Sequence, residues 1–240
     1  MKKLILATAL LALATGFASA QTIRLGTEGA YPPYNFINDK GEIDGFEKEL
    51  GDELCKRASL TCEFVQNDWD SIIPNLQSGN YDVIIAGMSI TEEREKIINF
   101  SQNYYPPAAS AYVGKTADVD VTKGVISAQV STIQSAAVAA SGATLLEFAT
   151  PDETIAAVRN GEADAVFADK DYLAPFVADS NGELMFVGED VALGGGVGLG
   201  MRESDTELKG KFDAAIQSMK DDGTLNTLIT KWFGETGATF

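Results

Sequence analysis

One polar segment in the first half of the chain has the residue types needed to hold a small anion. Residues 82–94 read DVIIAGMSITEER, an apolar strand-like run followed by a short polar loop and a helix start. Thr91 is a preferred helix N-cap, and the free amide N–H groups at such a helix start attract carboxylates or phosphates. Arg94, one turn later, adds a guanidinium that can hold a carboxylate through two parallel hydrogen bonds. The segment predicts a carboxylate site at the carboxyl end of a strand; the alternative is an ordinary turn with a surface arginine.

The groups that most enzymes and metal sites use are missing from this sequence. It contains no histidine, which removes the commonest general base and metal ligand. The serine at position 89 lacks the spacing of a nucleophile elbow, and the glycine run at 194–200 lacks the spacing of a dinucleotide loop. We therefore predict no catalytic residue, no metal and no cofactor, although chemistry by aspartate and glutamate remains open.

The first twenty residues have the pattern of an export signal. Two lysines precede an apolar run from Leu4 to Ala14, and small residues end at Ala20, where cleavage is expected. Removal of this segment takes the formal net charge from −17 to −19, because Lys2 and Lys3 are lost. So acidic a chain repels nucleic acid and anionic membrane surfaces, and we expect neither as a partner.

Two cysteines, Cys55 and Cys62, occur in the sequence. In an exported protein two neighbouring cysteines are expected to pair. The disulfide would connect the end of one helix to the start of the next strand.

Strand-like and helical patterns alternate along almost the whole mature chain, which is typical of an α/β protein with largely parallel sheets. The expected strands are 22–26, 62–65, 82–86, 110–113, 125–128, 144–148, 164–168, 184–187 and 197–201, and the expected helices are 46–57, 69–78, 132–140, 151–160, 172–179, 208–219 and 225–233.

Two stretches, 106–109 and 194–198, interrupt this alternation and are candidate hinges. Two crossings predict a discontinuous first lobe, residues 21–109 plus 196–240, and a continuous second lobe, residues 110–195. The alternative is a single doubly wound sheet with loops at these places.

Several segments in a fixed order resemble one protein family. They read GTEGAYPPYNF, GFEKELGDELCKR and DWDSIIPNL in the first half of the chain, and ADAVFAD and DGTLNTLITKWF in the second. With the 82–94 segment, they resemble the periplasmic amino-acid-binding proteins of ABC importers, extracellular solute-binding protein family 3. The branch that is most similar binds lysine, arginine and ornithine, histidine or opines. The resemblance implies a two-lobed periplasmic-binding-protein fold, each lobe a mostly parallel sheet flanked by helices, joined by a two-strand hinge.

The resemblance also implies how an amino acid would be held. Arg94 would bind the α-carboxylate, helped by Ser89 and Thr132, and Asp169 would accept from the α-ammonium. These roles agree with the chemistry of the residues, because buried charges must be paired. The alternative for Asp169 is a cap on the helix that follows it.

Side-chain recognition would fall to Glu28, Tyr31 and Trp69, with Asp68 nearby. The two rings could sandwich a long stem, and Glu28 could meet a distal positive charge; the alternative is that both rings are plain core aromatics. Ala86 and Gly87 complete the expected ligand-binding set.

Three departures from the family pattern blur this assignment. The connection KGVISA, residues 123–128, is shorter than usual before the pair Ser131 and Thr132, so the alignment of residues 128–132 could slip by one position. Ala86 and Gly87 stand where relatives often have two serines. Val130 stands where a glycine commonly precedes the Ser-Thr pair, although valine resists positive φ.

From this we expect a monomeric periplasmic protein that captures a free amino acid, most naturally arginine, lysine or ornithine, by hinge closure and delivers it to an inner-membrane ABC permease. Glutamine, histidine or an opine are open alternatives as ligand. From other classes, a cyclohexadienyl (prephenate or arogenate) dehydratase on the same scaffold and a sensory module acting through a separate receptor also stay open.

Overall fold

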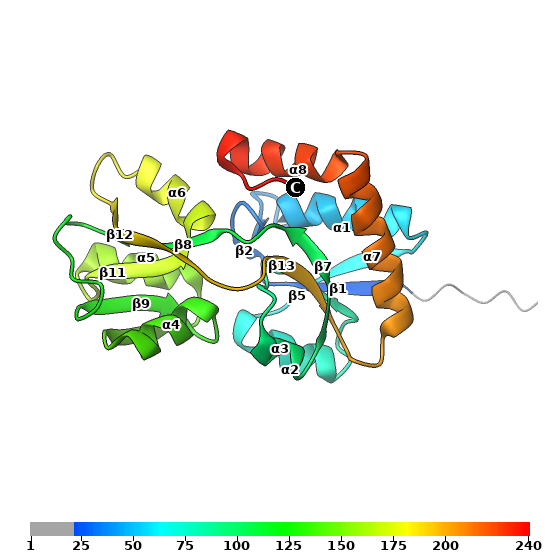
Figure 1. Ribbon diagram of the computed structural model, residues 1–240, viewed down its shortest axis with the longest axis horizontal. Coiled ribbons are helices and arrows are strands. Elements are labelled where there is room, and N and C mark those ends of the chain that lie inside the picture. Colours follow the sequence, from blue (N-terminus) through cyan, green and yellow to red (C-terminus); the bar gives the residue numbers. More distant parts are fainter. Residues whose placement is uncertain (1–21) are drawn as a thin grey trace, which may run out of the picture.

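The chain folds into two lobes, each built around its own five-stranded sheet (Figure 1). The computed structural model describes residues 22–240, so the predicted export signal and its cleavage after Ala20 lie outside the described residues. Each sheet has four strands running in one direction and one strand running against them, which confirms the predicted mostly parallel α/β architecture.

Lobe 1 contains the sheet with strand order β5-β1-β6-β13-β7. Its strands are β1 (Ile23–Thr27), β5 (Cys62–Gln66), β6 (Val83–Ile84), β7 (Asn99–Tyr105) and β13 (Val197–Met201). Its helices are α1 (Phe46–Arg57), α2 (Ile72–Gln77), α3 (Glu92–Glu95), α7 (Thr206–Asp221) and α8 (Thr224–Phe233), with short 3-10 turns at Trp69–Ser71 and Gly234–Thr236. A small antiparallel sheet of β2 (Ala30–Tyr31), β3 (Asn35–Ile37) and β4 (Ile43–Asp44) precedes α1.

Lobe 2 contains the sheet with strand order β10-β9-β11-β8-β12. Its strands are β8 (Ala109–Gly114), β9 (Val125–Gln129), β10 (Thr144–Phe148), β11 (Ala165–Asp169) and β12 (Met185–Ala192), and its helices are α4 (Ile133–Ser141), α5 (Pro151–Asn160) and α6 (Lys170–Ala178).

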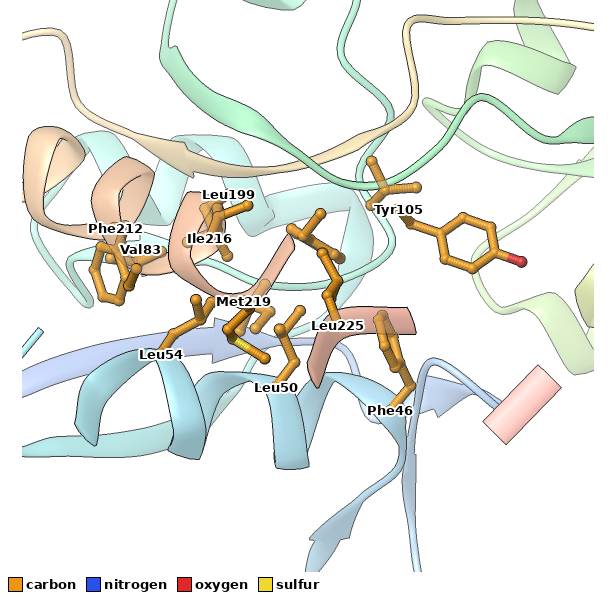
Figure 2. Close-up of a cluster of buried hydrophobic side chains, with 14 of the residues drawn as sticks. Phe46, Leu50, Leu54, Val83, Tyr105, Leu199, Phe212, Ile216, Met219 and Leu225 are labelled. Carbon is orange, nitrogen blue, oxygen red and sulfur yellow. The ribbon is translucent and has the colours of Figure 1, made fainter. Parts of the chain in front are cut away.

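Each sheet separates two apolar clusters, as expected where helices cover both faces. In lobe 1, Val83 packs with α1, α7 and α8, whereas its neighbour Ile84 packs with α2 on the opposite face. Figure 2 shows the larger cluster, in which Leu50 and Leu54 of α1 lie opposite Ile216 and other side chains of α7. In lobe 2, α5 and α6 pack against one face and α4 against the other.

The chain crosses between the lobes twice, from β7 to β8 and from β12 to β13 (Figure 1). The antiparallel strand of each sheet, β13 in lobe 1 and β8 in lobe 2, lies directly after a crossing. Gly196 in the second crossing has φ +92°, and a Cβ there would approach the Tyr105 carbonyl oxygen to 2.6 Å, so only glycine fits. The lobe boundaries at residues 109/110 and 195/196 stay a prediction.

Two parts of lobe 1 were not expected from the sequence. Strand β7 was missed because its NFSQNYY sequence has no apolar run, and the small sheet of β2, β3 and β4 was missed because its strands are only two or three residues long. The disulfide between Cys55 and Cys62 is present and connects α1 to β5.

Candidate functional site

A cavity lies where the two lobes meet. All nine residues predicted to bind ligand line it, together with three that were not predicted, and the twelve are Glu28, Tyr31, Trp69, Ala86, Gly87, Ser89, Arg94, Gln129, Thr132, Ile133, Gln134 and Asp169. The structure therefore brings the predicted set together, whereas its role in binding stays a prediction.

Arg94 is held in the cavity wall by the local structure predicted for its segment. Thr91 is the N-cap of α3, and its hydroxyl accepts from the Arg94 amide at 3.2 Å. The guanidinium donates to the carbonyl oxygens of Ser89 (2.8 Å) in lobe 1 and Ser131 (3.2 Å) in lobe 2. Arg94 is not the surface arginine of the alternative interpretation, because only 9% of it is exposed.

No carboxylate among residues 22–240 forms an ion pair with Arg94, whose guanidinium bonds are to neutral carbonyls. Burial lowers the pKa of Arg94 to about 10, so it stays cationic at neutral pH. A buried charge is costly when no opposite charge contacts it, and Asp169 acts on Arg94 only at longer range. The cavity is therefore suited to an anionic group at this point.

Asp169 ends β11 on the lobe 2 side of the cavity. It occupies the N-cap position of α6, yet its side chain makes no capping hydrogen bond, so the capping alternative is wrong. Its carboxylate instead accepts from the Tyr31 hydroxyl at 2.9 Å and from Gln134 Nε2 at 2.9 Å. Burial raises the pKa of Asp169 to about 6, which leaves it largely ionised at neutral pH.

Glu28 follows β1 and faces lobe 2 directly. Its Oε1 accepts from Gln129 Nε2 at 2.7 Å, and only 7% of the residue is exposed. Burial raises the pKa of Glu28 to about 7. With Asp169, the cavity thus holds two carboxylates that lack a cationic hydrogen-bond partner in the described residues.

The two predicted aromatic residues line the cavity but also have partners within the protein. The ring of Tyr31 stacks on Tyr172 with centroids 4.2 Å apart and planes 11° from parallel. The ring of Trp69 lies 5.4 Å from the Arg94 guanidinium carbon, within cation–π range. One face of Tyr31 is therefore covered by lobe 2, and the predicted sandwich of a ligand stem between the two rings stays a prediction.

The turn next to Val130 forms with its positive-φ residue one position later than the family pattern suggests. Ser131, not Val130, takes the positive φ, at +60°. Val130 does not have a positive φ, and its amide donates to the Phe148 carbonyl oxygen at 2.9 Å. Thr132 then caps α4, with its hydroxyl accepting from the Ser135 amide at 3.1 Å. The turn that was in doubt therefore forms without a glycine at position 130.

Three lining residues, Gln129, Ile133 and Gln134, were missed from the sequence. Gln129 is the last residue of β9, just as Asp169 is the last residue of β11. Because parallel strands end at one edge of a sheet, the predicted β9 was a usable signal for Gln129. Gln134 had no comparable signal, because its place in the first turn of α4 depends on the turn at Ser131.

Among residues 22–240, no group of three or more histidine, cysteine, aspartate or glutamate side chains is arranged to hold a metal ion. In the same part of the chain, no helix combines the length and apolarity that crossing a membrane requires.

Comparison with known proteins gives one family over nearly the whole chain. Residues 23–235 match the family model of bacterial extracellular solute-binding proteins, family 3. A solved His/Glu/Gln/Arg/opine family-binding protein from Silicibacter pomeroyi, in complex with lysine, is 73% identical, with a TM-score of 0.90 over 91% of this chain and 100% of that one.

Two relatives from Escherichia coli K12 show a similar extent of match. The putative ABC transporter arginine-binding protein 2 is 33% identical over 97% of this chain and 99% of its own length. The lysine/arginine/ornithine-binding periplasmic protein is 30% identical over 97% of both chains.

Proposed function

Because the chain belongs to family 3 of the bacterial extracellular solute-binding proteins, we propose that it binds a free cationic amino acid, with lysine as the first candidate, in the cavity between its lobes. The observation that carries this proposal is the charge pattern of the cavity. Within residues 22–240, Arg94 is a buried cation that forms no ion pair and interacts with Asp169 only at longer range, and Glu28 and Asp169 are buried carboxylates without a cationic hydrogen-bond partner. One carboxylate and two ammonium groups, as in lysine, complement this pattern.

Each end of the ligand has a place in the proposal. The α-carboxylate lies at Arg94, the α-ammonium at Asp169, and the distal cation at Glu28. The lysine complex of the Silicibacter pomeroyi protein, at 73% identity, supports lysine, and the names of the Escherichia coli relatives support arginine and ornithine as members of the same ligand class.

The energies are sufficient for useful affinity. A hydrogen bond to a charged group contributes about 1.5–3 kcal/mol. A few such bonds, after the loss of ligand and side-chain freedom, reach the roughly −8 kcal/mol of micromolar binding.

Closure of the lobes would follow from contacts on both sides. Arg94 and Glu28 lie on lobe 1 and Asp169 on lobe 2, so an amino acid held by all three stabilises the closed arrangement. We propose that this closed form, acting as a monomer in the periplasm, delivers the ligand to an ABC permease. The relatives support the location and the transport role through their descriptions as periplasmic and ABC-transporter proteins.

The competing functions make different predictions. A dehydratase would need a general acid aimed at a leaving hydroxyl, whereas Asp169 already accepts two hydrogen bonds and can remain ionised. Turnover of prephenate or arogenate, followed by absorbance, would indicate that enzyme. Recovery of a receptor rather than a permease from membranes would indicate the sensory role.

Isothermal titration calorimetry tests the ligand class. The mature protein, unfolded and refolded to remove bound ligand, is titrated with arginine, lysine, ornithine, histidine, glutamine, octopine and glutamate. We expect micromolar or tighter binding of a cationic amino acid and no binding of glutamate. Binding of glutamine alone would contradict the role of Glu28, and no binding by any ligand would contradict the proposed function.

A further inference from the structure

Glu47 is a carboxylate buried completely in lobe 1, outside the lining of the cavity. It lies in the first turn of α1, where its amide donates to the Tyr34 carbonyl oxygen at 2.8 Å. Burial raises the pKa of this carboxylate, and three hydrogen-bond donors act against that shift. An ionisable group in such a place is costly unless its oxygens are fully used.

The three donors come from three separate segments of the chain. Oε1 accepts from the Gly87 amide at 2.6 Å and from the Tyr104 hydroxyl of β7, and Oε2 accepts from Asn35 Nδ2 at 2.6 Å. Asn35 in turn uses its Oδ1 to accept from the Gly29 amide at 2.7 Å. The Glu47 carboxylate therefore fixes two loop amides, that of Gly87 directly and that of Gly29 through the Asn35 side chain.

Both of these amides belong to loops that form the cavity. Gly87 lines the cavity itself, and Gly29 directly follows Glu28. Both glycines have positive φ, +63° for Gly87 and +74° for Gly29. In this left-handed conformation a loop amide is not paired along a strand, so it needs an acceptor from elsewhere. Glu47 and Asn35 supply those acceptors from the core side.

The orientation of the Gly87 amide has a consequence on the cavity side. In a trans peptide the N–H and C=O groups point in opposite directions. Since the Gly87 N–H points to Glu47 in the core, the carbonyl of Ala86 in the same peptide points the other way. Ala86 lines the cavity, so this carbonyl is directed to the side where a ligand ammonium can donate to it.

We propose that Glu47 is a positioning residue, which sets the ligand-binding conformation of the 28–29 and 86–87 loops without touching ligand. The inference rests on the proposed function, because it assigns these loops to amino-acid recognition. An aliphatic residue in place of Glu47 would fill the space but leave the Gly87 amide and Asn35 without an acceptor. A glutamine keeps the size but retains one acceptor oxygen, which can accept from Gly87 and Tyr104 or from Asn35 but not from both sides, and its NH₂ group then faces another donor.

The test compares Glu47→Gln with a matched core variant, Leu54→Ala. Leu54 is also fully buried on α1, two turns further along, and makes no hydrogen bond through its side chain. Stability is measured by urea unfolding, and lysine affinity by calorimetry under conditions where both variants are folded. We expect Glu47→Gln to weaken lysine binding at least tenfold and Leu54→Ala to change it less than twofold. Equal losses in the two variants, or unchanged affinity in Glu47→Gln, would overturn the proposal.

A spectroscopic measurement tests the same inference without ligand. A hydrogen bond to a buried carboxylate moves an amide proton downfield, so ¹H–¹⁵N spectra of the wild type should show the Gly87 amide downfield of ordinary glycine amides. Glu47→Gln should move the Gly87 amide or, through Asn35, the Gly29 amide toward its ordinary position, and Leu54→Ala should move neither. If neither the Gly87 nor the Gly29 amide moved in Glu47→Gln, the proposed contacts would be refuted, even if the wild type bound no amino acid and the proposed function failed.

A second variant covers the case in which Glu47→Gln does not fold. Asn35→Ala removes only the link from Glu47 to Gly29. We expect it to move the Gly29 amide and to weaken lysine binding at least threefold, while the Gly87 amide stays in place. Wild-type affinity in Asn35→Ala would contradict the part of the proposal that concerns the 28–29 loop.

Discussion

Acidification should weaken lysine binding, because the carboxylate proposed to meet its distal ammonium is half protonated near neutral pH. The pKa of Glu28 is raised to about 7 by burial. A cationic ligand needs the ionised form, so the apparent dissociation constant grows with the protonated fraction of the ligand-free protein. Between pH 7.5 and 5.5 a group with this pKa weakens binding about 25-fold.

The same titration predicts proton release that calorimetry can count. At pH 6.5 about three quarters of Glu28 is protonated before binding, so each bound lysine should release about 0.8 of a proton from this group. Titrations in two buffers with different heats of ionisation give the total release, to which Asp169, with a pKa of about 6, adds about 0.2 of a proton. Glu28→Gln should remove the Glu28 share and leave about a fourfold effect of pH from Asp169.

Stability without ligand should respond to pH in the opposite sense. The folded-state pKa of Glu28 lies above its ordinary value of 4.5, so the folded protein keeps a proton that the unfolded chain has lost. Its stabilising effect is present below pH 4.5 and is lost as pH rises toward 7. Compared with Glu28→Gln, the wild type should therefore gain stability between pH 7.5 and 5.5.

Lysine affinity that stays constant or rises on acidification would refute the assignment of Glu28.

Three substitutions test other parts of the structure. Arg94→Ala should weaken lysine binding at least tenfold in a protein that still folds, and unchanged affinity would remove Arg94 from the carboxylate site. Tyr31→Phe deletes the hydroxyl that joins the lobes through Asp169. Because one hydrogen bond contributes about 0.5–1.5 kcal/mol, lysine affinity should fall about two- to tenfold. Tighter lysine binding would argue against this contact in the closed form. Replacing Cys55 and Cys62 by serine should lower the free energy of unfolding by about 2–3 kcal/mol in urea titrations and leave lysine affinity unchanged. A large loss of lysine affinity would mean that the disulfide also shapes the cavity.

Local signals in the sequence were sufficient for most of the fold. The alternation of apolar runs and amphipathic segments predicted nine strands and seven helices that correspond to elements of the structure. Strand β7 was missed because several of its polar residues have hydrogen-bond partners far away in the sequence. Ser101 Oγ accepts from the Leu199 amide at 2.9 Å, and the Gln102 amide donates to Asp213 Oδ1 at 2.7 Å. Nothing within residues 99–105 reveals those partners.

In the site, too, some residues could be predicted from the local sequence, whereas other contacts depend on residues far apart in the chain. Arg94 was predictable because a strand, a cap and a helix start follow one another within thirteen residues of sequence. The contact of Tyr31 with Asp169 was not, because 138 positions separate the two residues and only the approach of the lobes brings them together. The stacking of Tyr31 on Tyr172 has the same origin.

Calorimetric titration with lysine and two compounds that each lack one of its charged groups tests the central claim most directly. Norleucine lacks the distal ammonium, and 1,5-diaminopentane lacks the α-carboxylate. We predict micromolar or tighter binding of lysine and at least 100-fold weaker binding of both other compounds, because each leaves a buried charge of the cavity unpaired. Norleucine binding as tightly as lysine would contradict the role of Glu28, and 1,5-diaminopentane binding as tightly would contradict the role of Arg94.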